Sequence, residues 1–308
     1  MREKYFRRYF IKTLVPIFVM ITLFGVPSLL FVWSYSTKVV NKSTSDLLSL
    51  TKYNMELILN ESTFLLNSLD ENVTNRVNLK DFFYTDHYSY EKIRTHNNLI
   101  NIINSPTNVR GYIHSIYVYL DNPYENLLVS NIGLTTVENN YDQSWMDSYL
   151  NQNENVYVWA ERREIKRYPF EKEPEEVISM FFRFKHMRGL LVLNIKNSSL
   201  AEMIGETGAF ADQQLIITTK SGNVIFNNKK DLPFPGSGIT DIREKVGEKV
   251  SFGGQRYIVS TLYNSSYEWN YISLVPQHSA YQISYSMIRL ILIVGVLGIA
   301  VSVVIAYF

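Results

Sequence analysis

The side chains best suited to bind a small molecule are aromatic and charged groups spread between positions 117 and 183. The chain holds 22 Tyr, 17 Phe and 4 Trp, and ligand sites in proteins are mostly apolar with a few placed polar groups. Aromatic faces beside carboxylates suit a sugar or another neutral polar solute. The alternative is that these aromatic side chains only pack a core. The predicted contacts are four aromatic residues and four charged partners: Tyr117, Tyr119, Trp145 and Trp159, with Asp121, Asp147, Arg162 and Arg183.

Other kinds of site lack the residues that they need. The chain has no cysteine, which excludes disulfide scaffolds, cysteine zinc sites, iron–sulfur clusters and thiol nucleophiles. It has no P-loop, Rossmann or G-x-S-x-G pattern, and the acidic residues around Pro174 are typical of a solvated loop. We therefore expect neither an enzyme nor a cofactor. A metal site is not expected either, because no histidine pair has H-x-x-x-H or H-E-x-x-H spacing: His87, His96, His114, His186 and His278.

Composition and charge narrow the class of protein further. Hydrophobic residues make up 46% of the 308 residues, which excludes a disordered or collagen-like chain. The 30 Lys and Arg residues and 29 Asp and Glu residues give a net charge of +1. Nucleic-acid binders carry clustered positive charge, so we expect no nucleic-acid partner for this chain.

Two uncharged apolar runs bracket the sequence and predict two membrane spans. One covers the 25 residues 13–37, and the other covers the 19 residues 290–308. A transmembrane helix needs about 20 apolar residues to cross a hydrocarbon core of about 30 Å. We place the spans at 13–37 and 287–308, so the lipid bilayer is an expected partner. The alternative for each run is a buried core helix.

The charges before the first span predict the orientation. Positive residues mark the cytoplasmic side, so we expect residues 1–12 to be a cytoplasmic tail, residues 38–288 to be extracellular, and both termini to be cytoplasmic. Because the second span reaches Phe308, we also expect a further cytoplasmic part beyond this sequence. The tail carries five basic residues against Glu3: Arg2, Lys4, Arg7, Arg8 and Lys12.

A long helix is predicted to leave the membrane over residues 38–79. Its apolar residues recur at helical spacing, and a continuous helix of this kind is a stiff rod. We expect two copies of the chain to form a parallel homodimer along residues 40–75. The alternative is a monomer whose apolar stripe packs only on its own chain. The stripe consists of Ile58, Leu65, Leu69, Val73 and Val77.

The rest of the outer region predicts two antiparallel-sheet modules of the α+β class. The membrane-distal module covers 80–205 and the membrane-proximal module covers 206–282. A turn is expected at Pro106 and Gly111, and a loop at 234–238. The distal module has predicted helices at 88–104, 144–150 and 197–204 and strands at 113–120, 127–132, 156–159, 177–184 and 190–195. The proximal module has predicted strands at 215–219, 224–227, 249–252, 256–263 and 269–275.

Five stretches of this outer region resemble the double Cache (dCache) sensors of Gram-positive membrane regulators. The stretches are SIYVYLDNPYENLLVSNIG (115–133), YDQSWMDSYL (141–150), VISMFFRF with GLLVLNI (177–184 and 189–195), IITTKSGNVIFNN (216–228) and EWNYISLVP (268–276). The resemblance implies two PAS-like modules on a long helix between an anchor and a return span. It implies a sensor for a small extracellular solute.

The same resemblance implies two classes of signalling protein. Membrane-bound AraC-type transcription regulators are preferred, because YDQSW follows SIYVYLDN. The sensor of a YesM-type histidine kinase is the alternative, and a non-signalling protein that binds envelope components is a rival class. Amino-acid-binding dCache domains have an R-x-W-Y pattern before a later Asp. Only the Trp of that pattern stands in residues 143–146, so the resemblance does not predict an α-amino-acid ligand.

Overall fold

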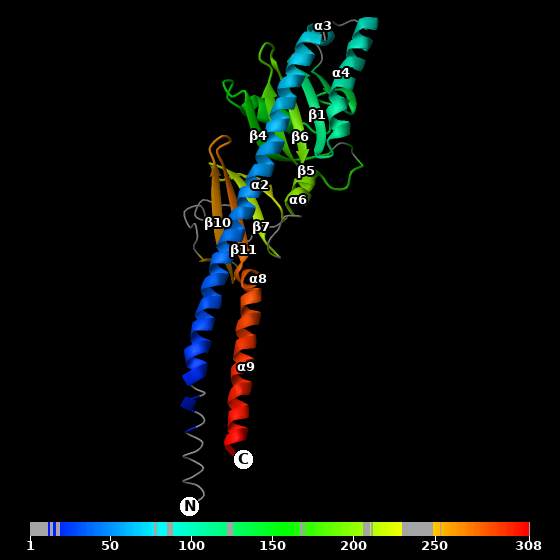
Figure 1. Cartoon of the computed structure of the whole chain (residues 1–308). Coiled ribbons are helices and arrows are strands. Elements are labelled where there is room, and N and C mark those ends of the chain that lie inside the picture. Colours follow the sequence, from blue (N-terminus) through cyan, green and yellow to red (C-terminus); the bar gives the residue numbers. More distant parts are fainter. Residues whose placement is uncertain are drawn as a thin grey trace, which may run out of the picture.

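The structure is a computed structural model and describes most of the chain (Figure 1). The basic tail before Lys12, residue Val77 of the predicted stripe and the loop 234–238 lie outside the described residues, as does His87. The described residues are 12, 15–16, 19–76, 79–84, 89–121, 126–166, 168, 170–205, 210, 212–229, 249–252 and 254–307.

One helix joins the first apolar run to the outer region. After a π-helical turn, η1 (Ile21–Gly25), helix α2 (Val26–Arg76) continues for 51 residues without a break. At about 1.5 Å per residue it is about 76 Å long, far longer than a bilayer is thick. Helix α9 (Gln282–Tyr307) carries the second apolar run. Both helices are long and apolar enough to cross a membrane.

Helices α2 and α9 lie side by side below the proximal sheet (Figure 1). The Trp33 ring stacks on Tyr281 with centroids 5.1 Å apart, and the Ser284 hydroxyl donates a hydrogen bond to Ser36. Helix α2 therefore contacts α9 and the residue before it just below the proximal sheet.

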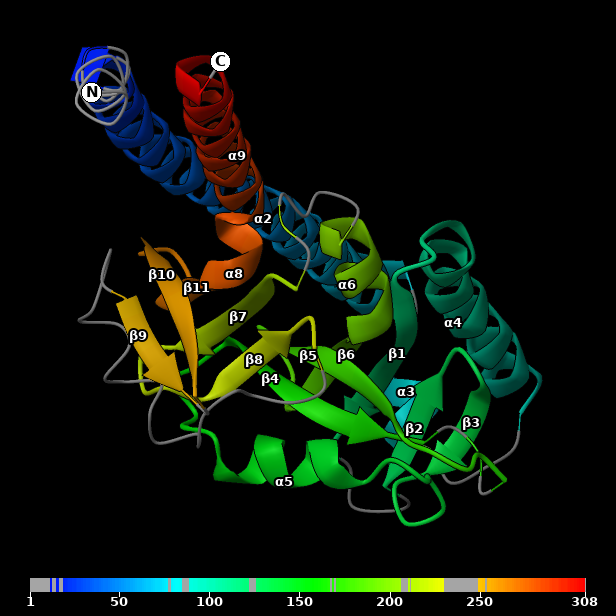
Figure 2. The same ribbon diagram turned by 90° about the horizontal axis from the view of Figure 1, so that it is seen from below.

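The distal sheet has six antiparallel strands in the order β3-β2-β1-β6-β5-β4. Its central strands are apolar on both sides because both faces are covered. Figure 2 shows α2 on one side of this sheet and α5 (Ser144–Asn151) on the other. The strands are β1 (Ile113–Leu120), β2 (Leu127–Ser130), β3 (Gly133–Thr136), β4 (Val158–Ile165), β5 (Glu175–Arg183) and β6 (Gly189–Lys196).

Four details differ from the sequence predictions. Strand β3 was not predicted, and β4 runs to Ile165 instead of ending at Trp159, because its charged residues have partners inside the fold. The helix predicted at 88–104 is α4 (Tyr90–Val109), which continues through Pro106. A proline inside a helix removes one N–H donor and crowds the carbonyl four residues earlier. Helix α4 nevertheless continues for one more turn, where Pro106 is buried and its carbonyl accepts from the Arg110 N–H. A short helix, α3 (Leu79–Tyr84), follows α2.

The proximal sheet has five antiparallel strands in the order β8-β7-β11-β10-β9. Helix α6 (Asn197–Gly205) follows β6 of the distal sheet, and α8 (Gln277–Ala280) joins β11 to α9. The strands match the predicted segments to within a residue or two: β7 (Gln214–Thr219), β8 (Val224–Asn227), β9 (Lys249–Phe252), β10 (Gln255–Asn264) and β11 (Trp269–Pro276).

Both sheets pack on α2, so this one helix connects the two sheets of the outer region. Ile58 and Leu69 of the predicted stripe are buried in one core that also includes residues of both sheets. Polar contacts add to this packing. Glu61 accepts hydrogen bonds from Arg110 (2.6 Å) and Tyr112 (2.8 Å) on the distal side. The α+β class, with its long helix and two antiparallel sheets, is therefore confirmed.

Candidate functional site

An aromatic cluster lies between the distal sheet and α5. Side chains alternate across a strand, so Tyr117 and Tyr119 of β1 face α5 while Ile116 and Val118 face the core on α2. The Tyr119 ring lies 5.2 Å from Trp145, and Trp159 stacks on Phe181 at 4.8 Å. We define the aromatic cluster as Tyr117, Tyr119, Trp145, Tyr149, Trp159 and Phe181.

The aromatic cluster is closed but carries unused hydrogen-bond donors. Trp145 is fully buried, and Tyr117 and Tyr119 are almost so. Burial raises the pKa of Tyr119 to about 12 and also raises that of Tyr117, so both hydroxyls stay protonated at neutral pH. The indole N–H groups of Trp145 and Trp159 have no acceptor among the residues that the structure describes. A buried N–H without an acceptor is costly, so a ligand or water oxygen would be stabilised there.

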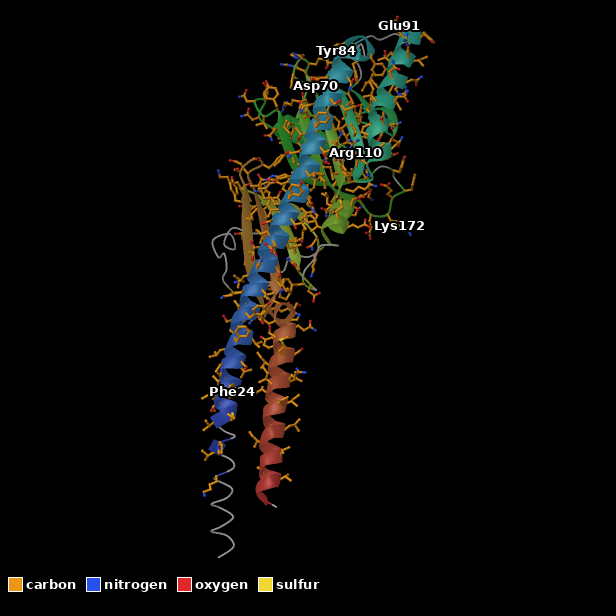
Figure 3. All side chains as sticks on the ribbon, in the orientation of Figure 1. Phe24, Asp70, Tyr84, Glu91, Arg110 and Lys172 are labelled. Carbon is orange, nitrogen blue, oxygen red and sulfur yellow. The ribbon has the colours of Figure 1, made fainter. Side chains whose placement is uncertain are left out.

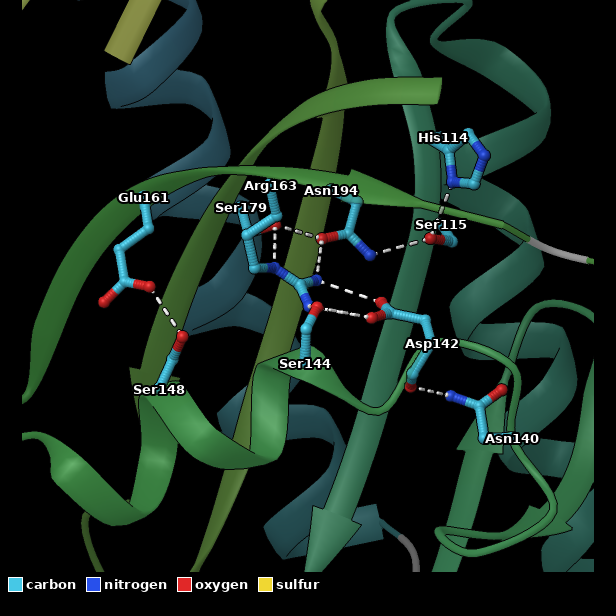
Figure 4. Close-up of polar contacts among 10 residues, drawn as sticks. All are labelled: His114, Ser115, Asn140, Asp142, Ser144, Ser148, Glu161, Arg163, Ser179 and Asn194. Carbon is cyan, nitrogen blue, oxygen red and sulfur yellow. Dashed lines mark hydrogen bonds and ion pairs between the residues drawn. The ribbon is translucent and has the colours of Figure 1, made fainter. Parts of the chain in front are cut away.

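Next to the cluster, Arg163 of β4 forms a buried ion pair that the sequence analysis did not predict (Figure 4). Its Nη1 and Nη2 atoms lie 2.9 and 3.0 Å from the two carboxylate oxygens of Asp142. It also donates to Ser179, Ser144 and Asn194. This bidentate geometry is the strong form of an arginine–carboxylate contact. The pair holds the start of α5 against the sheet.

The polar chain continues from Arg163 to the protein surface. Asn194 donates to the Ser115 hydroxyl at 2.8 Å, and that hydroxyl lies 2.9 Å from His114 Nδ1. The other ring nitrogen of His114 lies 3.4 Å from the half-exposed carboxylate of Glu175. Each side chain in this hydrogen-bonded series, from Asp142 to Glu175, has a polar partner. The arrangement is therefore suited to fixing the segment that leads into α5 rather than to holding a ligand.

The structure places the eight predicted residues in four locations. Tyr117, Tyr119, Trp145 and Trp159 come together in the aromatic cluster. Asp147 is exposed on the first turn of α5, and Arg162 points to the other side of β4, where it pairs with Glu176 at 2.6 Å. The last two, Asp121 and Arg183, line an open cavity.

This cavity has a volume of about 310 Å³ and lies at the end of the distal sheet that is farthest from the spans. It is enclosed by the end of β1, the C-terminal end of α5, the segment before β4 and the hairpin between β5 and β6. Its position is marked by Tyr84 of α3, labelled in Figure 3, whose hydroxyl donates to the Asp121 carbonyl at 2.7 Å. The lining residues that the sequence analysis missed include Tyr149, Gln152, Glu154, Tyr157, Lys185 and Arg188.

The guanidinium group of Arg183 forms the floor of the cavity. It donates to the carbonyl oxygens of Tyr149 (3.1 Å), Gln152 (3.0 Å) and Val156 (3.2 Å). It also lies 4.6 Å from the Tyr149 ring centroid and 5.3 Å from that of Trp159. Arg183 thereby fixes the end of α5 and connects the cavity to the aromatic cluster. Among the described residues, no group of three His, Asp or Glu side chains is arranged to hold a metal ion.

No family model matches the chain, and no curated protein matches its sequence. Three solved structures resemble its fold. The periplasmic sensory domain of the Campylobacter jejuni chemoreceptor Tlp1 has a TM-score of 0.51 at 14% identity, covering 79% of this chain and 98% of that one. The ligand-binding domain of Tlp3 from the same organism, in complex with L-norvaline, has 0.51 at 12%, covering 80% and 94%. The extracellular domain of a protein described as a histidine kinase, vpHK1S-Z8, has 0.51 at 11%, covering 82% and 96%.

At these identities the similarity shows the fold alone. The chain therefore has the fold of extracellular ligand-binding sensor domains found in chemoreceptors and histidine kinases.

Proposed function

We propose that this chain is the extracellular sensing region of a membrane signalling protein of the double Cache type. The observation that carries the proposal is the continuity of α2. One helix runs from an apolar span, past the proximal sheet, to the far end of the distal sheet. A change at that end therefore acts on an element that itself enters the membrane, and a ligand can bias it by binding two arrangements with different affinity.

The preferred output is an AraC-type transcription regulator, on the sequence stretches that resemble those sensors. A histidine kinase is the second candidate, and the likeness to the vpHK1S-Z8 extracellular domain supports it. The two are separated by testing whether the complete gene product binds DNA or transfers phosphate from ATP to its own histidine.

The ligand is a small solute that binds the distal module. The Tlp3 domain was solved with the small solute L-norvaline bound, and the cavity here falls at the lower end of the 300–1,000 Å³ typical of small-molecule sites. The aromatic cluster with its two unpaired indole N–H groups supports a hydroxyl-bearing solute, such as the sugar that composition favours.

The functional test is solute-dependent stabilisation of the full chain in lipid nanodiscs. A ligand of the folded state stabilises it by RT ln(1 + [L]/Kd), so thermal melting in the presence of amino acids, short peptides, sugars and organic acids should identify at least one class that raises the melting temperature. If every class of solute leaves the melting temperature unchanged, the chain is not a solute sensor. The rival function, binding of envelope components, is then favoured.

The proposed topology puts both termini in the cytoplasm and the two sheets outside. Lys172, labelled in Figure 3, is exposed on the distal module, and the chain has no natural cysteine. A membrane-impermeant maleimide should label Lys172→Cys in intact cells as fully as in lysed cells. Labelling only after lysis would reverse the orientation.

A parallel homodimer is part of this proposal, and the structure changes the face that would form it. The predicted stripe is largely used inside the monomer, since Ile58 and Leu69 are buried. A second stripe is exposed on α2: Leu50, Tyr53, Leu57 and Phe64 are 42%, 61%, 51% and 75% exposed. Their spacing of three, four and seven residues is the heptad pattern of a coiled-coil seam, which favours the same helix of a second copy.

Cysteine crosslinking in membranes tests the dimer. Leu50→Cys, Tyr53→Cys and Leu57→Cys should each form disulfides between copies, while Lys52→Cys, which lies on a neighbouring part of the helix surface, should form few. Equal crosslinking at all four positions would indicate random collision, and none at any position would indicate a monomer.

A further inference from the structure

The hydrogen bonds between Arg163 and His114 can run in only one direction at the middle of the series (Figure 4). A guanidinium group donates and never accepts, and Arg163 donates to the side-chain oxygen of Asn194 at 3.0 Å. The amide nitrogen of Asn194 therefore points to Ser115 and donates to its hydroxyl at 2.8 Å. Ser115 is fully buried, so its own hydrogen must find a second acceptor inside the protein.

Two acceptors lie within reach of the Ser115 hydroxyl. One is His114 Nδ1, at 2.9 Å. The other is the Tyr117 hydroxyl, which lies within hydrogen-bonding reach of both Ser115 and Asp142. A neutral imidazole carries its hydrogen on one nitrogen only, and His114 Nε2 lies 3.4 Å from the Glu175 carboxylate. That contact places the hydrogen on Nε2, so Nδ1 of the neutral ring accepts from Ser115.

A protonated His114 reverses this end of the series. The imidazolium carries a hydrogen on both nitrogens, so Nδ1 donates to the Ser115 oxygen instead of accepting from it. The Ser115 hydrogen then turns to Tyr117, whose own hydroxyl donates to Asp142. Consecutive hydrogen bonds in a protein interior strengthen one another. Protonation of one ring thereby ties Asp142, at the start of the segment that leads into α5, more firmly to β1.

Charged groups of both signs surround His114. The half-exposed Glu175 favours the protonated ring and gives the proton a route to solvent, while burial and the cations of the same face oppose protonation. On the face toward α5, the charged or titratable groups are Glu175 of β5, Lys196 of β6, Arg163 of β4, Asp142 and Tyr117; toward α2 they are Glu61 with Arg110 and Tyr112, and Arg162 with Glu176. The β4–β5 loop at the same end of the sheet adds Lys166, Glu171, Lys172 and Glu173, and α6 contributes the neutral groups Asn197 and Ser198.

We propose that His114 is a proton switch of the distal module, which fastens the segment before α5 to β1 when the medium outside the membrane becomes acidic. Histidine is the side chain that titrates between about pH 5 and 8. Because α5 covers the aromatic cluster, a more firmly held segment makes the cluster harder to open. The inference rests on the proposed sensing function and adds its regulation by protons, without assigning a solute.

The test combines two measurements on the full chain in nanodiscs, without any solute. In the first, the protein is labelled at the histidine ring carbons, and the resonance missing from His114→Asn identifies His114. It should titrate between about pH 5 and 8. In the second, hydrogen exchange of residues 142–149 is corrected for the intrinsic effect of pH. Exchange should slow in acid by roughly threefold to tenfold, the equivalent of one hydrogen bond, with the midpoint of the His114 resonance.

Variants separate the switch from a general effect of acid. His114→Asn offers a carbonyl acceptor in place of Nδ1 and cannot titrate, so exchange of residues 142–149 should no longer depend on pH. Tyr117→Phe removes the second acceptor of Ser115. The His114 midpoint should then fall by roughly half to one pH unit, and the change in exchange should be lost. Glu175→Gln should also lower the midpoint. His278→Gln, at an exposed histidine of α8, is the matched control and should change neither measurement.

Two results would overturn the inference. One is a His114 resonance that does not titrate between about pH 5 and 8. The other is slower exchange in acid that persists unchanged in Tyr117→Phe. If His114→Asn does not fold, the Tyr117→Phe and Glu175→Gln variants decide the question, because the first keeps the ring and the second changes a half-exposed side chain. Since no solute is used, failure here leaves the sensing function in place, and failure of every solute in the melting test leaves the proton response in place.

Discussion

The two sheets are built alike but differ on the faces that point away from α2. The outer face of the distal sheet carries a buried ion pair, Arg163 with Asp142, beside the aromatic cluster. The outer face of the proximal sheet is an aliphatic cluster that includes Val259, Ile272 and Leu274. On the face toward α2, the Gln213 amide donates a neutral hydrogen bond to the Ser273 hydroxyl at 2.8 Å.

This difference suggests a division of labour. Moving two charged groups from water into the protein interior is costly. Replacing a buried ion pair with apolar residues of similar volume often leaves the protein equally stable. The distal sheet nevertheless keeps an ion pair, and the pair anchors the segment that leads into α5 and the cavity. The outer face of the proximal sheet is covered by aliphatic side chains. In the proposed function, the distal sheet recognises the solute far from the membrane and the proximal sheet transmits the change near it.

The largest expected effect comes from breaking the distal ion pair. Arg163→Met leaves the Asp142 carboxylate buried without a cationic partner, although the Ser144 hydroxyl still donates to it. This should lower the free energy of unfolding by about 3–5 kcal/mol. Thermal or denaturant melting of the full chain in detergent checks this. The double variant Arg163→Met with Asp142→Leu should recover much of the loss. Unchanged melting of the single variant would show that the pair is not closed in solution.

Trp145→Phe should have a smaller effect on stability and a visible one on recognition. The change keeps an aromatic ring but shortens a fully buried side chain, which should cost about 1–3 kcal/mol, and the indole N–H is lost entirely. The variant should melt somewhat below the parent but stay folded, and the response to a hydroxyl-bearing solute should weaken. Trp145→Ala is a poor test because Trp145 is fully buried. Unaltered affinity in the folded Phe variant would remove Trp145 from the ligand contacts.

On the proximal sheet, Gln213→Met should cost only about 1 kcal/mol, the usual value of one neutral hydrogen bond. One amide oxygen of Gln213 already lacks a partner among the described residues, so little else is lost. The melting temperature reports the cost, and ligand affinity should be unchanged. If this variant were as destabilised as Arg163→Met, the contrast between the polar contacts of the two sheets would disappear.

The smallest expected effect concerns the contact of the distal module with α2. Hydrogen bonds from Arg110 and Tyr112 lower the pKa of Glu61 below its ordinary value of 4.5. A lowered pKa in the folded state means that the contribution is complete above pH 4.5 and is lost as the pH falls through the folded pKa. Glu61→Gln should therefore be less stable than the parent at pH 7, by no more than about 1 kcal/mol. Melting at pH 7 and at pH 3 should show the difference disappear; a constant difference would point to shape rather than charge.

Hydrophobic patterning predicted most of the elements because it records burial directly. Ile113–Leu120 and Lys249–Phe252 were predicted to the residue. The end of β4 was missed because Arg162 and Arg163 look alike in sequence as solvated charges. Only the register of β4 shows that one of them enters the sheet interior while the other pairs with Glu176.

The candidate site was predicted in part for a related reason. Tyr119 and Trp145 were predicted as ligand contacts, and the structure brings their rings together in the aromatic cluster. The cavity was mostly missed because its lining comes from four separate segments at strand and helix ends. No spacing rule connects Glu154 with Arg188, since their proximity depends on how the β5–β6 hairpin folds over α5.

Hydrogen exchange of the full chain in nanodiscs, with and without a stabilising solute, tests the central claim most directly. The claim is that the distal module recognises the solute and the proximal module transmits the change. Bound solute should slow exchange in residues 149–157 and 183–189 and alter it along α2, with smaller changes in β10 and β11. Protection confined to residues 249–276, with none in the distal module, would contradict the account.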